Sequence, residues 1–292
     1  MHSAAATRRR CQTCLLAACL TLSPLAAVAA CPDEAAVSAY LADFIAKRPS
    51  KGFGNDLSLA DAECAKHKVA ARLPGVLGAI EGYKAGFTSA ALQQRFGVDS
   101  PKWAYMFERN LVGSGALIPA AFGARPVVEA DFLVIVKDAG LADAKTPLDA
   151  LDHLTAVVPF MELADLMLEG SFSGTALIAT NVAFRGGVIG KYIPVVKSQA
   201  FLDALATMTV VMTDQATGTE LGRARGSALM DNPINAAMWL AQTLKKEGIT
   251  LKPGESLSLG GFIPPLPAKA GMEVKVQYIG LPEDPSVSIL LD

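Results

Sequence analysis

Three acidic residues are the clearest candidates for chemistry in this chain. Glu129 and Asp131 lie two positions apart in the segment Pro126–Val136, and Glu162 follows in Val157–Asp165. The first segment is rich in branched residues and is predicted to form a strand, in which residues two apart share one face. Acidic side chains that lead into an apolar strand need a partner, because burying an unpaired charge is costly. A hard divalent ion held by oxygen ligands fits this cluster, and a solvated strand end is the alternative.

The N-terminus has the pattern of a secretory signal. Residues 8–10 are arginines, and they precede an apolar stretch over residues 11–30 that ends in small residues. This order predicts a cleaved signal peptide over residues 1–30. A transmembrane anchor is the weaker interpretation, because polar residues and Pro24 interrupt the stretch. We expect the mature protein to be periplasmic or secreted.

The charge of the mature chain excludes some partners. The full chain has 26 basic and 28 acidic residues. Residues 1–30 include three arginines and no acid, which leaves 23 minus 28, a net charge of −5. An acidic chain without basic runs argues against nucleic acid or anionic lipid as a partner.

Two cysteines, Cys31 and Cys64, remain after residue 30. In an oxidising compartment, two cysteines suggest one disulfide. The alternative is that Cys31 is lipidated, since residues 28–31 loosely match a lipoprotein cleavage box. The protein would then be anchored by lipid, and Cys64 would be an unpaired thiol.

Helix signals are clearest near the start of the mature chain. Asp33 can cap a helix over residues 34–47, and Ser58 with Asp61 resembles a capping box that opens a helix running toward Ala71. Cys64 falls on the second helix and Cys31 precedes the first, so a bridge between them would tie the two helices together. A later helix is predicted over residues 235–246, with Asn232 as its cap and Gly248 as its stop.

From Gly113 onward the pattern changes to short apolar runs broken by Gly and Pro. These runs predict a curved, mostly β region. With the helices, they place the chain in the α+β class. The runs are residues 127–136, 175–183, 186–195, 207–214, 256–262 and 272–279.

Two neighbouring segments carry a family resemblance. Gly82–Ser89 (GYKAGFTS), followed by Leu92–Pro101 (LQQRFGVDSP), resembles the signature of the 2-keto-4-pentenoate hydratase and 4-oxalocrotonate decarboxylase family, part of the fumarylacetoacetate hydrolase superfamily. The order of later segments also fits, and the resemblance covers roughly residues 34–290. These segments are the Glu129 strand, Val158–Glu162, Ala179–Asn181, Asn232–Ala241, and a closing Pro253-Gly254 and Gly260-Gly261.

The resemblance implies a fold and a domain organisation. It implies a fumarylacetoacetate hydrolase-like mixed β-roll or sandwich with an N-terminal helical cap. Residues 1–30 would be the signal peptide, 31–110 the helical cap region, and 111–292 the β-rich catalytic domain. We also expect a homo-oligomer, and no segment after residue 30 offers an apolar run long enough to span a bilayer.

The resemblance also implies a metal site. In the family an acidic triad binds Mg²⁺ or Mn²⁺, and it maps to Glu129, Asp131 and Glu162. Asp131 is a departure from the family's Glu, although Asp is still a hard oxygen ligand.

Roles for three further residues follow from the same resemblance. Lys84 would be catalytic, either by binding a substrate carboxylate or by transferring a proton at a lowered pKa. The alternative is a solvated surface lysine. Phe87 and Asn181 would contact the substrate.

The implied substrates are small 2-oxo acids or their 2-hydroxydienoate tautomers. A divalent ion chelated by the C1 carboxylate and the C2 oxygen would stabilise an enolate, which serves hydration and decarboxylation alike. Two features depart from the family: Lys102 stands where an acid/base Asp is expected, and Gly261-Phe262 replaces a late substrate-contacting turn. An exported hydratase-like lyase is therefore one hypothesis, and a non-catalytic 2-oxo acid binding protein with the same fold is the other.

Other motifs do not point to chemistry. His67 and His153 lack a metal-binding spacing and are interpreted as surface or helix residues. Ser171–Gly174 is not a nucleophile elbow, and Gly186-Gly187 lacks the flanking pattern of a dinucleotide loop.

Overall fold

A computed structural model describes residue 2 and residues 31–292. Apart from His2, the predicted signal peptide lies outside the described residues. The helices are α1 (Glu34–Ile45), α2 (Leu59–Arg72), α3 (Pro74–Leu77), α4 (Ala90–Phe96), α5 (Pro147–Ala150), α6 (Gly174–Ala179), α7 (Gln199–Thr207) and α8 (Pro233–Lys246). The strands are β1 (Ile80–Gly86), β2 (Lys102–Phe107), β3 (Leu111–Gly113), β4 (Ala116–Ile118), β5 (Pro126–Val136), β6 (Leu154–Asp165), β7 (Phe184–Ile189), β8 (Ile193–Pro194), β9 (Thr209–Asp214), β10 (Thr219–Arg225), β11 (Ser256–Ser258), β12 (Leu266–Pro267), β13 (Glu273–Ile279) and β14 (Ser286–Leu291).

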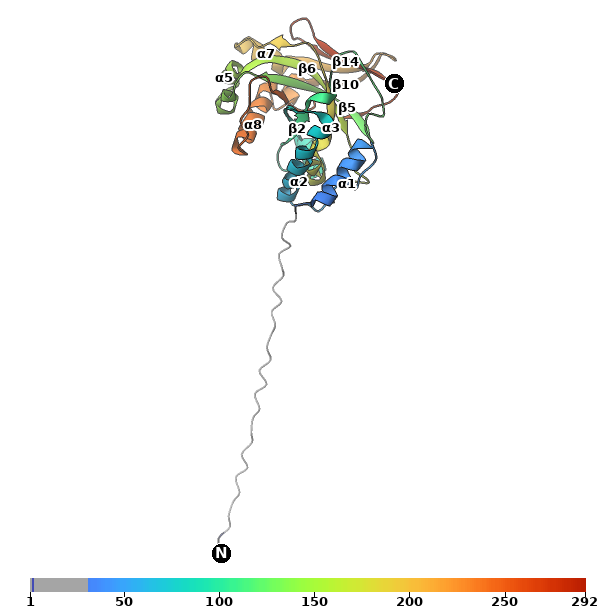
Figure 1. The fold of residues 1–292 in the computed structure, drawn as a ribbon. Coiled ribbons are helices and arrows are strands. Elements are labelled where there is room, and N and C mark those ends of the chain that lie inside the picture. Colours follow the sequence, from blue (N-terminus) through green and yellow to red (C-terminus); the bar gives the residue numbers. More distant parts are fainter. Residues whose placement is uncertain (1, 3–30) are drawn as a thin grey trace.

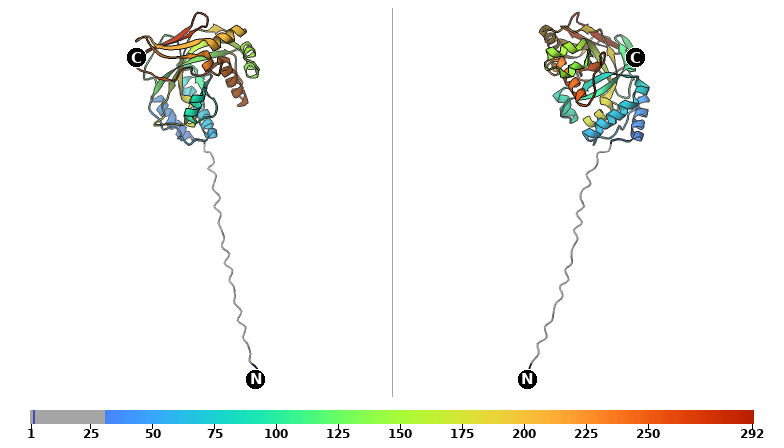
Figure 2. Two further views of the ribbon diagram at one scale, coloured as in Figure 1. Left: turned by 180° about the vertical axis from the view of Figure 1, so that it is seen from behind. Right: turned by 60° about the vertical axis from the view of Figure 1, so that its left-hand side comes forward.

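The strands form two mixed sheets. The larger has nine strands in the order β2-β1-β11-β5-β6-β7-β3, with β12 beside β5 and β8 beside β6. The smaller has five strands in the order β10-β9-β13-β14-β4. Helices α1 and α2 lie at one end of the molecule and the five-stranded sheet lies at the other, as Figures 1 and 2 show. The mixed sheets with attached helices confirm the predicted α+β class.

The central strand β5 is buried on both faces after its first few residues. Phe132 and Val134 belong to the main core. Leu133 and Ile135 belong to a second core, which includes residues of α1 and α2. Of the acidic residues on β5, Asp131 is therefore buried, whereas Glu129, nearer the start of the strand, is partly exposed.

The predicted helix caps are confirmed. The Asp33 carboxylate accepts a hydrogen bond from the Ala36 amide at 2.8 Å, and Ser58 accepts one from the Asp61 amide at 3.1 Å. Asn232 accepts one from the Ile234 amide at 3.0 Å, at the start of α8. Side-chain acceptors satisfy amides that the first helical turn leaves unpaired, which explains why local sequence sufficed to place these helices.

Residues 175–183 are not a strand, contrary to the sequence prediction. They form most of α6, followed by the irregular segment 181–183. Ser173 caps this helix by accepting a hydrogen bond from the Ala176 amide. A short apolar run that is buried on all sides shows no periodicity to separate helix from strand.

The predicted cap region contains strands as well as helices. Its first three helices occupy residues 34–77, whereas β1 and β2 pair with each other and join the large sheet through β11. The region that carries Lys84 is thus continuous with the sheet that carries the acidic residues.

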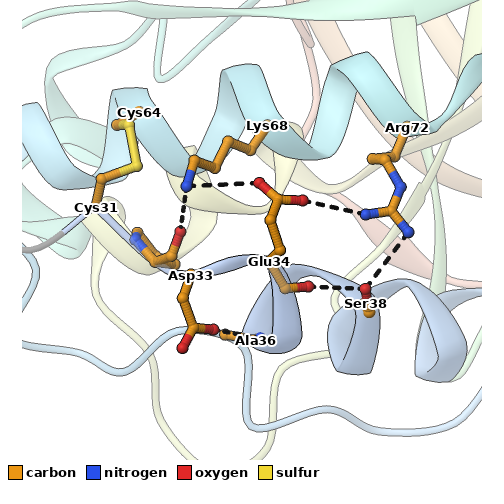
Figure 3. Close-up of polar contacts among 9 residues, drawn as sticks. Cys31, Asp33, Glu34, Ala36, Ser38, Cys64, Lys68 and Arg72 are labelled. Carbon is orange, nitrogen blue, oxygen red and sulfur yellow. Dashed lines mark hydrogen bonds and ion pairs between the residues drawn. A yellow bond between two sulfur atoms is a disulfide. The ribbon is translucent and has the colours of Figure 1, made fainter.

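A disulfide joins α2 to the residues that precede α1. In the structure Cys31 and Cys64 are bonded, with their Cα atoms 5.7 Å apart (Figure 3). Polar contacts run alongside the bond: Lys68 donates to the Pro32 carbonyl at 2.8 Å, and Arg72 pairs with Glu34 at 3.2 Å. The first two helices are therefore fastened by a covalent link and by ion pairs. Within the described residues, none of the helices has the length and apolar character required to cross a membrane.

Candidate active site

The pairing of β5 with β6 places the three acidic residues on one face of the large sheet. Glu129 lies directly opposite Glu162 in the antiparallel register. Asp131 lies two residues further along β5, and residues two apart on a strand share a face. Nearby, the Tyr278 hydroxyl donates to the carbonyls of Asp131 and Phe160, and so fastens the two strands at this point.

The three carboxylates have different partners. Asp131 is fully buried and accepts hydrogen bonds from the Ser258 hydroxyl at 2.7 Å and the Gly260 amide at 3.0 Å. Glu162 is 2 % exposed and forms an ion pair with Lys84. Glu129 lines a cavity, and within the described residues it accepts no hydrogen bond. Glu129 is therefore the carboxylate that is free to take a new partner.

Lys84 reaches this face from β1. It is only 4 % exposed, so it is not a surface lysine. Besides its ion pair with Glu162, its ammonium donates to the Val182 carbonyl at 3.1 Å. The close approach of β1 to β11 requires Gly82, because a Cβ there would lie 1.9 Å from the Ser256 carbonyl oxygen.

Burial and like charge dominate the electrostatics of the site. Burial, followed by the charge of Glu162, raises the pKa of Glu129 to about 8 and that of Asp131 to about 7. Burial opposes the charge on Lys84, but Glu162 and Glu129 outweigh it and the net effect raises the pKa of Lys84. The expectation of a lowered lysine pKa is wrong for this arrangement: Lys84 is held as a cation between acids.

A cavity of about 180 Å³ opens onto these groups. Glu129, Glu162 and Lys84 form its polar end, and the predicted residue Phe87 is in its wall. Gly261 leaves room beside Glu129, since a Cβ at this position would lie 2.9 Å from the Glu129 Oε2 atom. The remaining wall is mostly apolar and consists of Ala85, Gly86, Thr88, Leu92, Arg95, Phe96, Leu166, Leu177, Val182, Ala183, Pro264 and Pro265.

Strained backbone borders the cavity. Asn181, Val182 and Ala183 have φ values of 59°, 48° and 58°, a run of left-handed residues that are not glycine. Such conformations cost on the order of 1–3 kcal/mol each and persist only where the surroundings enforce them. Here the Lys84 ammonium holds the Val182 carbonyl. The strained segment thus supplies an acceptor that holds the Lys84 ammonium.

Asn181 and Lys102 lie outside the cavity wall. The Asn181 side chain exchanges two hydrogen bonds of 2.9 Å with the backbone of Tyr105, which fastens β2 to the strained segment. Its contact with a ligand stays a prediction. Lys102 donates to the Ser100 hydroxyl at 2.9 Å, so the residue that replaces the expected acid points to other partners.

Arg95 is the charged cavity residue to which sequence reasoning assigned no role. It lies at the end of α4, within the segment Leu92–Pro101 that carries the family resemblance. Its guanidinium lies 5.2 Å from the centre of the Phe96 ring. The signal that would have found it is its position, since it is a basic residue on the helix that directly follows the strand of Lys84.

The three carboxylates are the type of ligand that a hard divalent ion prefers. Glu129 accepts no hydrogen bond from any described residue, and burial, followed by the charge of Glu162, raises the pKa of both Glu129 and Asp131. Within the described residues, the three acids do not bring one oxygen each within 4.8 Å of the others. In this arrangement Lys84 holds Glu162, and Ser258 holds Asp131.

Several known proteins are similar to this chain. It is 30 % identical over 205 residues to a 2-keto-4-pentenoate hydratase of Burkholderia vietnamiensis, covering 69 % of this chain and 75 % of the relative. It is 26 % identical over 231 residues to a 4-oxalocrotonate decarboxylase of Pseudomonas sp. strain CF600, covering 77 % and 84 %. The structure of 4-oxalocrotonate decarboxylase from Pseudomonas putida G7, complexed with magnesium and adipate, superposes with a TM-score of 0.77 at 22 % identity and covers 88 % of this chain and 96 % of that one. No protein-family model matches the chain.

The mixed sheets and the buried acidic face define a protein with the fumarylacetoacetate hydrolase-like fold. Within that class, the extent and identity of the match to the Burkholderia enzyme show that the chain belongs to the 2-keto-4-pentenoate hydratase family. Its curated relatives are hydratases and decarboxylases, which are lyases.

Proposed function

We propose that this protein is an exported, divalent-metal-dependent lyase that hydrates or decarboxylates a small 2-oxo or 2-hydroxydienoic acid. The observation that carries the proposal is Glu129, which has no hydrogen-bond or ion-pair partner among the described residues and lines the cavity next to the Lys84–Glu162 ion pair. The names of the relatives and the magnesium and adipate in the Pseudomonas putida structure support it.

The acidic triad would hold the metal. Glu129, Asp131 and Glu162 offer the all-oxygen donor set that Mg²⁺ and Mn²⁺ prefer. When bound, such an ion supplies Lewis-acid polarisation of a substrate carbonyl. Lys84 would be released from Glu162 in part, and its ammonium would then face the substrate as a carboxylate-binding group and a proton donor.

The cavity wall would orient the substrate and exclude water. Phe87 and Phe96 pack edge-to-face with their ring centres 5.5 Å apart, and both line the cavity. Apolar walls strengthen the electrostatic interactions at the polar end, because they lower the local dielectric constant. A short, flat acid chain fits a cavity of about 180 Å³.

Arg95 favours a substrate with a second carboxylate. Within the described residues it is the cavity cation that has no acidic partner, whereas Lys84 is paired with Glu162. A guanidinium is suited to binding a carboxylate through two parallel hydrogen bonds. We therefore place 2-oxo dicarboxylic acids ahead of monocarboxylic acids as substrates.

The direct test uses the mature protein, residues 31–292, and the loss of dienoate ultraviolet absorbance on addition of Mg²⁺ or Mn²⁺. We expect metal-dependent turnover in the wild type and none in Glu129→Gln, because this change removes the available ligand while keeping the side-chain volume. Glu169→Gln, at an exposed position, is the matched control and should react normally. The proposal fails if the wild type reacts equally well in EDTA.

A second candidate is a binding protein without catalysis. Lys102, which lies outside the cavity, and the turn at Gly261-Phe262 both depart from the pattern of the family. Calorimetry that shows tight binding of a 2-oxo acid with metal, without any change in the absorbance of a dienoate, would favour this function.

A further inference from the structure

Three potential metal ligands meet where α2 contacts β2 and the end of α8, away from the cavity. Glu63 and His67 lie four residues apart on α2, a spacing that places side chains on one face of a helix. Glu247, at the C-cap of α8, joins them from the other end of the sequence. One ligand atom of each residue lies within 4.8 Å of the others.

Each of these side chains is oriented by a different neighbour. The Tyr105 hydroxyl is 2.9 Å from the His67 Nδ1 atom, and the Trp103 indole donates to the Glu247 Oε1 atom at 2.8 Å. Lys66 forms an ion pair with the Oε2 atom of Glu63. The contacted atom is one of two potential donors in each side chain, so Nε2 of His67 and the second oxygen of each carboxylate are left for another partner.

This arrangement of outer contacts is typical of metal sites. Metal-binding histidines and carboxylates almost always give their second polar atom to a neighbouring group, which fixes the side chain before the ion arrives. Two of the neighbours, Trp103 and Tyr105, lie on β2, and their rings pack with centres 4.9 Å apart. The orienting groups are therefore anchored in the sheet, although His67 and Glu247 are themselves exposed.

Charged groups of both signs surround the three ligands. Glu63 and Glu247 contribute two negative charges, and the buried ammonium of Lys66 contributes one positive charge. Besides its ion pair with Glu63, Lys66 lies 3.6 Å over the Trp103 ring and donates to the Trp103 carbonyl at 3.2 Å. The two carboxylates and Lys66 together carry a net charge of about −1 at neutral pH with His67 neutral, and Lys102 and Lys246 line the same surface pocket as Glu63 and Glu247.

We propose that Glu63, His67 and Glu247 form a second metal site, selective for Zn²⁺ or a similar transition-metal ion, that links α2 to the C-terminal end of α8. One imidazole nitrogen with two carboxylate oxygens is a donor set that Zn²⁺ accepts, whereas Mg²⁺ prefers oxygen ligands alone. The two sites of this protein therefore take ions of different classes. The ion at the second site would clamp the N-terminal helices onto the body of the fold.

The test is a calorimetric titration of the mature protein with ZnCl₂ in the presence of excess Mg²⁺, which occupies all-oxygen sites. We expect one equivalent of Zn²⁺ to bind the wild type and Glu129→Gln alike. His67→Ala and Glu247→Gln should each lose this equivalent. His153→Ala is the matched control, since His153 is partly exposed and contacts Asp138 instead, and it should bind as the wild type does.

A second readout separates metal binding from mere folding. Tyr105→Phe keeps all three ligands but removes the contact to His67, and we expect it to weaken Zn²⁺ binding by about tenfold. In differential scanning fluorimetry, Zn²⁺ should raise the Tm of the wild type and of His153→Ala, and leave that of His67→Ala unchanged. The proposal is overturned if the wild type binds no Zn²⁺ under these conditions, or if His67→Ala and Glu247→Gln bind it with undiminished affinity.

Discussion

The two acidic clusters of this protein differ in burial and in how their negative charges are stabilised. On the large sheet, Glu129, Asp131 and Glu162 are enclosed, and burial raises the pKa of Glu129 to about 8. Where α2 meets the end of α8, Glu63 and Glu247 reach solvent, and each is held by its own neighbour. A bound cation should therefore stabilise the buried carboxylates strongly. It should stabilise the exposed and already paired carboxylates less, so that binding there depends more on the placement of the ligands.

This difference predicts where the removal of a charged partner should cost the most folding free energy. In the enclosed cluster, removal of one partner leaves the other in a region that water does not reach. In the exposed cluster, a released carboxylate can be hydrated. The predictions below perturb one cluster at a time, from the largest expected effect to the smallest.

Lys84→Met should break the enclosed cluster most severely. The substitution removes the cation from a buried ion pair with Glu162, and the loss of one partner of such a pair costs about 3–5 kcal/mol of folding free energy. Turnover or 2-oxo acid binding should also disappear, while Mg²⁺ binding persists. Urea unfolding with and without Mg²⁺ measures the cost.

The matched variant is Lys66→Met in the exposed cluster. Lys66 is equally buried, but its partner Glu63 is 25 % exposed and can be hydrated when the lysine is removed. We expect a smaller loss of stability than for Lys84→Met. Equal losses of stability in the two variants would show that the burial of the remaining carboxylate does not determine the cost.

The disulfide should matter for the exposed cluster and not for the enclosed one. Cys31–Cys64 closes a loop with a sequence separation of 33, which stabilises the fold by roughly 3–4 kcal/mol in the chain-entropy model. Cys64 lies on α2 beside Glu63, so Cys31→Ser with Cys64→Ser should weaken Zn²⁺ binding and spare Mg²⁺ binding. Intact mass under non-reducing conditions checks the bond itself; a lipid mass on Cys31 would contradict it.

The enclosed cluster should make metal-free stability depend on pH. The folded pKa values of about 8 for Glu129 and about 7 for Asp131 lie above the ordinary values near 4, so the native state binds protons more tightly than the unfolded state. Their contribution to stability is full below about pH 4 and is lost as the pH rises through about 7 to 8. In EDTA this pair therefore lowers the Tm across that window.

Added Mg²⁺ should offset this loss. The Mg²⁺-induced rise in Tm is expected to grow between about pH 5 and pH 8, since the ion replaces the protons. Glu129→Gln should flatten the trend. A rise in Tm that is the same at every pH would show that the carboxylates are already ionised without metal.

Arg95→Gln should have the smallest effect, because this residue is exposed. The matched ligands are 2-oxoadipate and 2-oxohexanoate, which differ at the distal end by one carboxylate. We expect the wild type to prefer 2-oxoadipate by about tenfold, ~1.4 kcal/mol, and the variant to lose that preference. If both ligands bind the wild type equally, Arg95 does not select the substrate; if neither binds, the proposed function itself is in error.

Local sequence determined the parts of this protein that depend on short-range physics. The caps at Asp33, Ser58 and Asn232 act within one helical turn, and all three were predictable. The alternation of side chains along a strand likewise puts Glu129 and Asp131 on one face of β5, and their spacing alone is enough to predict it. The remaining cysteine pair was predictable because there is only one way to join two thiols.

Tertiary structure alone decided what surrounds those residues. The sequence does not show that Lys84 would pair with Glu162 and have a raised pKa, because the two strands that carry them are distant in the chain. It also predicted a strand over residues 175–183, where burial on all sides favoured α6. His67 was interpreted as a surface or helix residue, because its proposed partner Glu247 lies 180 residues away and only the approach of the end of α8 to α2 brings them together. Periodicity and capping act over a few residues, whereas a site depends on which distant elements pack against one another.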